Sequence, residues 1–186
     1  MKSDILKVLQ KFGAFQRGHF VLPSGKHSDI YIQCARLLQY PDKSMEFIEI
    51  VAKKIKNSNL NFDIILGPAI GGILISYELA RQLNKPMIYI EKVSGKMTLG
   101  KDFEIKNSQK ILIAEDVITS GKTVSETINL VEELGGEVVG IACMVNKENI
   151  TLDKKIYSCI NLDLKSYEEY ECPFCKKNLP IQPCKI

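Results

Sequence analysis

The sequence predicts an α/β fold in which a central, mostly parallel sheet carries helices on both faces. Two observations favour this fold. From residue 61 onward, apolar runs alternate with segments of helical periodicity, and these runs are nearly continuous, as in strands buried on both sides. The chain has 186 residues, 45% of them hydrophobic, which suffices for a full core. We therefore expect residues 1–186 to form a single domain.

The regular part of the chain, about residues 44–147, is expected to form the core of this domain. Its helices are predicted at 44–55, 73–83 and 124–134, from apolar residues at helical spacing. Its strands are predicted at 61–66, 87–90, 110–114 and 138–145. Glycine, proline and asparagine punctuate the junctions, at Gly67-Pro68, Asn84, Pro86 and Gly135-Gly136.

The two ends of the chain are less regular. An amphipathic helix is expected at 5–12 and a strand at 29–33. We expect residues 1–43 and 148–186 to form a small hood packed on the sheet. Residues 91–106 lie between two predicted strands, are rich in lysine and glycine and have no helical periodicity, so they are expected to form a flexible lid or a mobile surface loop.

Composition argues against several functional classes. The formal net charge is only +3, which gives no large basic field for nucleic acid or a membrane surface. No apolar run is long enough to span a bilayer, and the charged start MKSDILKVLQ is unlike a signal peptide. We therefore expect a soluble cytoplasmic protein with neither nucleic acid nor a membrane as partner.

Six cysteines are present. Cys34, Cys143 and Cys159 have apolar neighbours, as expected of reduced thiols in a core. Cys172-Pro-Phe-Cys175 has the spacing of a metal knuckle, and Cys184 with Cys159 could complete four thiolates for zinc. The usual second C-x-x-C is missing, so the alternative is a packed extension without metal.

The stretch ILIAEDVITSGKTV, residues 111–124, places two acids after an apolar run and follows them with threonine, serine and glycine. Ligands of an open parallel sheet bind beyond the carboxyl ends of its strands, where we expect Glu115 and Asp116 to stand. Residues 119–123 would turn into the next helix, whose amino terminus favours a phosphate. The acids must then face another part of the ligand, such as sugar hydroxyls or a developing positive charge. A ribose 5-phosphate meets both demands.

Two nucleotide-binding motifs are excluded. A P-loop requires glycine where this chain has Asp116, and residues 67–72 do not fit the dinucleotide pattern G-x-G-x-x-G. The glycines of 67–72 could instead allow backbone approach to a second anion such as pyrophosphate, or serve only helix–strand packing.

The segment ILIAEDVITSGKT resembles the phosphoribosyl pyrophosphate (PRPP) motif of type I phosphoribosyltransferases. Together with LPSGKHSDIYIQC, GPAIGGI, GKMTLGKDFEI and ECPFCKK, it is similar in order and spacing to bacterial orotate phosphoribosyltransferases, over nearly the whole chain. The resemblance implies a Mg²⁺-dependent transfer in which orotate N1 displaces pyrophosphate from C1 of PRPP. The product would be orotidine 5'-monophosphate, in pyrimidine synthesis. Magnesium would be held mainly by PRPP and water, with no dedicated protein ligand.

The resemblance also implies roles for individual residues. Asp116 and Lys96 are the expected catalytic residues, the acid beside the oxocarbenium-like sugar and the lysine on the lid. Thr119, Lys147 and Tyr31 are expected to bind orotate, and His27 to lie near the base or to cap a turn. The residues expected to bind PRPP are Gly71, Lys92, Lys101, Glu115, Asp116, Val117, Ile118, Thr119, Ser120, Gly121, Lys122 and Thr123.

Family members often share their lids across a homodimer, so a homodimer is expected. Lys147 stands where relatives often have arginine, and lysine lacks the bidentate fork that matches a carboxylate. This difference keeps open one alternative, a phosphoribosyltransferase for another base, such as a purine. An alternative of a different class is a regulator that binds PRPP without catalysis.

Overall fold

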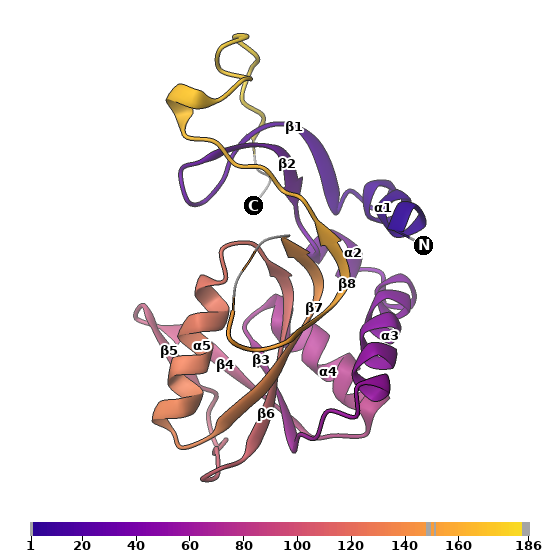
Figure 1. Ribbon diagram of the computed structural model, residues 1–186, viewed down its shortest axis with the longest axis vertical. Coiled ribbons are helices and arrows are strands. Elements are labelled where there is room, and N and C mark those ends of the chain that lie inside the picture. Colours follow the sequence, from indigo (N-terminus) through magenta and orange to yellow (C-terminus); the bar gives the residue numbers. More distant parts are fainter. Residues whose placement is uncertain (1, 148–149, 151, 184–186) are drawn as a thin grey trace.

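A six-stranded sheet forms the centre of the molecule in the computed structural model, which describes residues 2–147, 150 and 152–183 (Figure 1). The strand order is β5-β4-β3-β6-β7-β8, and all pairs are parallel except the edge pair β4–β5. The strands are β3 (Ile64–Pro68), β4 (Met87–Val93), β5 (Lys96–Leu99), β6 (Lys110–Ile118), β7 (Glu137–Lys147) and β8 (Ile156–Leu162). The predicted α/β fold is therefore confirmed.

Helices cover both faces of this sheet. α3 (Pro41–Asn57) and α4 (Gly71–Leu83) lie on one face, and α5 (Lys122–Glu133) lies on the other (Figure 1). Successive side chains of β6 alternate between the two cores: Leu112 and Ala114 join the α3/α4 cluster, whereas Ile111 and Ile113 join the α5 cluster. This double burial explains why the sequence of β6 reads as one continuous apolar run.

A smaller layer stands at one end of the sheet. It contains α1 (Lys2–Lys11), the antiparallel pair β1 (Phe15–Val21) and β2 (His27–Ile32), the short α2 (Ala35–Leu38) and the 3-10 helix η1 (Glu169–Glu171). The predicted hood comprised residues 1–43 and 148–186. We restrict the name hood to β1, β2 and the tail 163–183 that packs on them. The tail is held by backbone hydrogen bonds: His27 and Tyr167 exchange two of 2.8 Å, and the Gln182 N–H donates to the His19 carbonyl at 2.7 Å.

The structure departs from the sequence predictions at several elements. β1 and β8 are not among the predicted strands, and β8 adds a strand to the central sheet after residue 147, the predicted end of the core. A register irregularity between Arg17 and Phe20 interrupts the alternating pattern of β1, which hides it from a period-2 search. The segment 91–106 is not wholly irregular, because β4 continues to Val93 and pairs with β5 as a hairpin.

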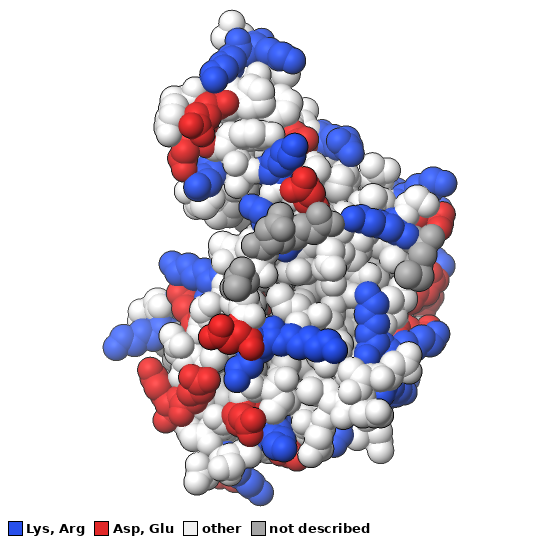
Figure 2. Space-filling model, in the orientation of Figure 1, with Lys and Arg blue, Asp and Glu red and all other residues white. Residues whose placement is uncertain are grey.

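The distribution of charged side chains on the surface is consistent with the small net charge. Lysine and arginine are interspersed with aspartate and glutamate on the face shown in Figure 2, without one dominant sign. Within the described residues, no helix combines the length and apolar character needed to cross a bilayer.

Candidate active site

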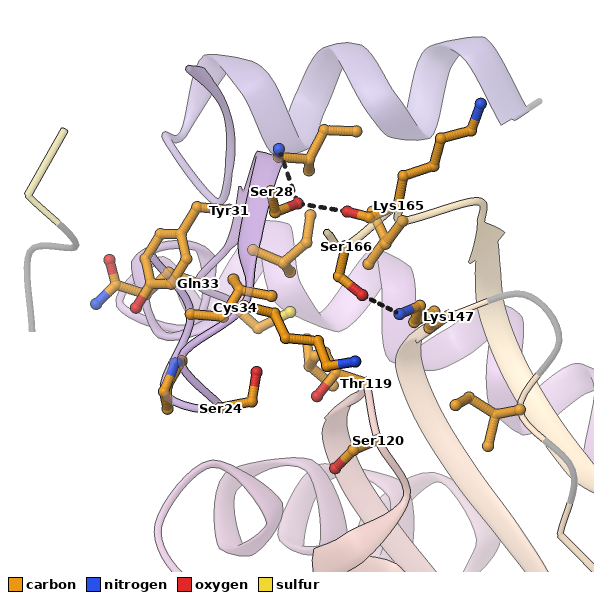
Figure 3. Close-up of a pocket in the computed structure, with 18 of the residues that line it drawn as sticks. Ser24, Ser28, Tyr31, Gln33, Cys34, Thr119, Ser120, Lys147, Lys165 and Ser166 are labelled. Carbon is orange, nitrogen blue, oxygen red and sulfur yellow. Dashed lines mark hydrogen bonds between the residues drawn. The ribbon is translucent and has the colours of Figure 1, made fainter. Parts of the chain in front are cut away.

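A cleft of about 640 Å³ opens between the hood and the carboxyl ends of β6 and β7. Five segments line it: the β1–β2 turn with β2 and the residues after it, the end of β6 with the loop beyond, Lys147 on β7, Ile150 after β7, and the tail at 164–166. Figure 3 shows their side chains arranged around the space, with Tyr31 and Gln33 opposite Lys147, and Thr119 and Ser120 below. The position matches the ligand crevice of open α/β sheets.

Asp116 is the acid that lines this cleft. It lies within β6, not after it as expected, because the strand continues to Ile118. Its Oδ1 accepts the Val117 N–H at 2.7 Å. Gly71 at the start of α4 approaches it so closely that a Cβ there would lie 2.6 Å from the Asp116 Cγ. Glycine at position 71 therefore allows the Asp116 carboxylate to pack directly against the backbone at the start of α4.

Glu115 is buried and does not line the cleft. Its carboxyl group nevertheless remains next to that of Asp116, because a side-chain hydrogen bond links the two acids. Its Oε1 accepts the Asp116 N–H at 3.0 Å. Burial and the neighbouring Asp116 charge raise the pKa of Glu115 to about 8, and burial also raises the pKa of Asp116.

The raised pKa of Glu115 makes folding stability depend on pH. Between its ordinary pKa and about 8, the folded protein keeps a proton that the unfolded chain has lost, so stability falls as the pH rises. We expect Glu115→Gln to remove a slope of up to about 1.4 kcal/mol per pH unit. Urea unfolding at several pH values, from roughly 5 to 8, would measure this slope of the unfolding free energy. Glu133→Gln, at an exposed site on α5, should retain the wild-type slope. Parallel curves for wild type and Glu115→Gln would contradict the assignment.

The loop after β6 can hold an anion. Thr119 and Ser120 are exposed and line the cleft, and Gly121 adopts φ 76° at the amino end of α5. The Lys122 N–H donates to Ser120 Oγ at 3.3 Å. The first N–H groups of a helix lack intrahelical partners and favour a negative ligand. The twelve-residue α5 provides such N–H groups beside this loop.

Of the other residues in the motif 115–123, some line the cleft and others do not. Val117 lines the cleft, whereas Ile118 is buried in the α5-side core. Lys122 and Thr123 are exposed in the first turn of α5 but do not line the cleft.

The space between Tyr31 and Lys147 can hold a planar, charged ring. Both residues line the cleft, and Lys147 Nζ donates to Ser166 Oγ at 3.4 Å (Figure 3). Tyr31 packs near the Phe20 ring, with centroids 5.6 Å apart. The tail is fixed here, because Ser28 Oγ donates to the Lys165 carbonyl at 2.8 Å. An aromatic ring and an ammonium group therefore face each other across the cleft (Figure 3).

The lid lysines lie apart from this cleft. Lys92, Lys96 and Lys101 are exposed at or near the β4–β5 hairpin, and none of them lines it. Lys92 Nζ contacts Glu126 of α5 at 3.3 Å. Any contact of these lysines with a ligand in the cleft would need movement of the hairpin or a second subunit.

Sequence reasoning missed some lining residues. Lys26 lines the cleft and pairs with Glu168 of the tail at 2.8 Å. The motif LPSGKHSD contains Lys26, so a signal was present. Lys165 and Ser166 reach the cleft only because the tail pairs with β2, and no local pattern in the sequence shows this.

The expected metal knuckle takes a different form. Cys172 and Cys175 lie together with His19 and His27, not with Cys159. Cys159 is in the core, where burial raises its thiol pKa to about 12, so it is not the missing ligand. Cys184 lies outside the described residues. His27 belongs to the cluster of cysteines and histidines and does not line the cleft.

Comparisons with known proteins agree on one family. The model of the phosphoribosyl transferase domain matches residues 34–171. The orotate phosphoribosyltransferase of Thermoanaerobacter sp. (strain X514) is 41% identical over 182 residues, which are 97% of this chain and 95% of that protein. The crystal structure of orotate phosphoribosyltransferase from Aeropyrum pernix has a TM-score of 0.73 at 26% identity, covering 85% of this chain and 93% of that one.

An adenine phosphoribosyltransferase shares the fold as well. The enzyme from Thermoanaerobacter pseudethanolicus has a TM-score of 0.67 at 21% identity, covering 83% of this chain and 99% of that one. At this identity the likeness concerns the fold alone.

Proposed function

Because this chain belongs to the phosphoribosyltransferase family, with an orotate phosphoribosyltransferase as a relative over almost its full length, we propose that it transfers the 5-phosphoribosyl group of PRPP to orotate. The products are orotidine 5'-monophosphate and pyrophosphate. One observation carries the proposal: Asp116, the Thr119–Ser120 loop and Lys147 meet in a single cleft. These groups suit a sugar, a phosphate and a carboxylate respectively.

In this mechanism the chain supplies position and electrostatics. The bond from orotate N1 to C1 forms as the bond from C1 to pyrophosphate breaks, and positive charge develops on the ribose. Asp116 faces that charge and the ribose hydroxyls, while residues 119–123 hold the 5'-phosphate at the amino end of α5. Tyr31 lies beside the base.

Magnesium suits this site as a companion of PRPP. Within the described residues, no group of three or more potential ligands gathers at the cleft, so the ion would be held mainly by PRPP oxygens and water. Among the described residues that line the cleft, Asp116 supplies the carboxylate, a hard oxygen donor. When bound, the ion would neutralise charge on the pyrophosphate oxygens.

We also propose that the active form is a cytoplasmic homodimer. Ile70, Leu74 and Tyr77 are 80%, 50% and 65% exposed, and their spacing places them on one face of the α4 region. An apolar face of this kind favours a partner. We propose that a second copy of the chain packs on this face. In such a dimer the lid lysines of one subunit could reach the cleft of its partner.

Lys147 is the proposed ligand of the orotate carboxylate. We expect Lys147→Met to raise KM for orotate about 10- to 100-fold, because a charge-assisted hydrogen bond is lost, and to leave KM for PRPP nearly unchanged. Steady-state kinetics in both substrates would measure this split. Lys165→Met is the matched control, since the Lys165 side chain points away from the other labelled groups in Figure 3. Equal orotate KM values for wild type and Lys147→Met would rule out this role.

The choice of base needs a direct test. Pyrophosphate release should be compared with orotate, hypoxanthine and adenine under the same PRPP and magnesium. We expect turnover with orotate alone. Turnover with a purine alone would replace orotate as the substrate while leaving the PRPP site intact.

A further inference from the structure

We propose that His19, His27, Cys172 and Cys175 form a structural zinc site that fastens the tail to the β1–β2 hairpin. The site lies in the hood, and none of its residues lines the cleft. The inference is independent of the proposed reaction.

The spacing of the ligand atoms fits one tetrahedral ion. One atom from each of the four side chains lies within 4.8 Å of all the others. Both cysteine sulfurs are 3.6 Å from His19 Nε2, and Cys175 Sγ is 3.3 Å from His27 Nδ1. Ordinary zinc bond lengths at tetrahedral angles require about 3.6 Å between sulfur and nitrogen and about 3.3 Å between nitrogens. The two imidazole nitrogens are 2.8 Å apart and would separate slightly around an ion.

The hydrogen bond of His19 prepares it as a ligand. His19 Nδ1 lies 2.8 Å from the Leu179 carbonyl, which can only accept, so Nδ1 carries the proton. His19 Nε2 therefore presents a lone pair to the cluster. A partner on the second ring nitrogen that fixes the tautomer is typical of metal-bound histidine. On binding, the two cysteine thiols would release their protons to solvent.

The chain around the cysteines forms a compact turn. The Lys176 N–H donates to the Cys172 carbonyl at 3.1 Å, and the Asn178 N–H donates to the Cys175 carbonyl at 2.9 Å. Phe174, between the cysteines, packs 5.7 Å from the His19 ring. This turn resembles a knuckle, with its two sulfurs directed at the histidines of the hairpin.

Burial and ligand type favour a structural role and zinc in particular. Cys172 is fully buried, and His19 and His27 are 3% and 4% exposed. Four protein ligands fill a tetrahedral shell and leave no position for substrate, and a set of two sulfurs and two nitrogens is typical of zinc. The ion would join residues of β1 and β2 to residues more than 140 positions later, holding in place the tail whose Lys165 and Ser166 line the cleft.

Metal analysis of the purified, reduced protein tests the proposal. We expect about one zinc per chain, surviving dialysis against a weak chelator. Cys175→Ser should lose the zinc while keeping the wild-type circular dichroism, because Cys175 is only partly buried. Cys159→Ala is the matched control and should retain the zinc, since this thiol lies in the core away from the cluster.

Cobalt gives a second readout that does not depend on the variants. Wild-type apoprotein reloaded with Co²⁺ should show the visible bands of a tetrahedral ion with thiolate charge transfer. Removing the metal should also lower the melting temperature and expose the tail to proteolysis. Absence of zinc from reduced protein, iron in its place, octahedral cobalt bands, or full zinc retention in Cys175→Ser would each overturn the proposal.

Discussion

Asp116→Asn is expected to lower kcat/KM by about 100- to 1,000-fold, as loss of one preorganised group facing transition-state charge does in other enzymes. The amide keeps the shape of the side chain and its contact with Gly71, but it removes the negative charge next to the forming oxocarbenium ion. Initial rates of orotate consumption at varied PRPP would measure the loss. The change should appear in kcat more than in the orotate KM.

Glu115→Gln provides the comparison for this variant. Glu115 is buried and absent from the cleft lining, so its replacement should cost less activity than that of Asp116. Unchanged turnover in Asp116→Asn, in protein with a wild-type melting temperature, would remove Asp116 from the catalytic role.

The second large effect concerns Lys96. We expect Lys96→Ala alone to lose most activity, because the charge of the departing pyrophosphate would be left uncompensated. If the lid of one subunit serves the cleft of its partner, mixing Lys96→Ala with Asp116→Asn should restore activity. Half of the randomly formed dimers are mixed, and one of their two clefts is intact, so roughly a quarter of wild-type activity should return.

The mixed dimers would be made by unfolding the two variants together and refolding them. As a control, each variant is unfolded and refolded alone, which should restore no activity. Lys53→Ala, at an exposed position on α3 far along the chain from the lid, should remain fully active. Full activity of Lys96→Ala would exclude the catalytic role of the lid lysine. Failure of the mixture to recover, with mixed dimers demonstrated by mass, would place Lys96 in its own subunit's cleft.

The central sheet was predictable because its strands are buried on both faces. The apolar runs at Ile64–Pro68 and Lys110–Ile118, with helical segments between them, leave few alternatives to a parallel sheet. The acid and threonine–glycine motif was predictable for the same reason, since it follows such a run directly. The sequence did not show that β6 continues through Asp116, nor that only one of the two acids lines the cleft.

The hood was less predictable because long-range pairing builds it. β1 is interrupted by an irregularity, and the tail is held beside β2 by an isolated bridge between His27 and Tyr167 and by the hydrogen bond from Ser28 to the Lys165 carbonyl. The cysteine knuckle was visible in the sequence, but its partners were not. His19 and Cys172 are 153 residues apart, and no local spacing joins them.

The most direct test of the proposed reaction is to mix the purified protein with PRPP, Mg²⁺ and orotate and to follow the loss of orotate absorbance. We predict turnover that requires all three components and falls sharply in Asp116→Asn. Absence of turnover with orotate, in protein whose melting temperature PRPP still raises, would contradict the proposed reaction and leave a PRPP-binding protein with another base or a regulatory role.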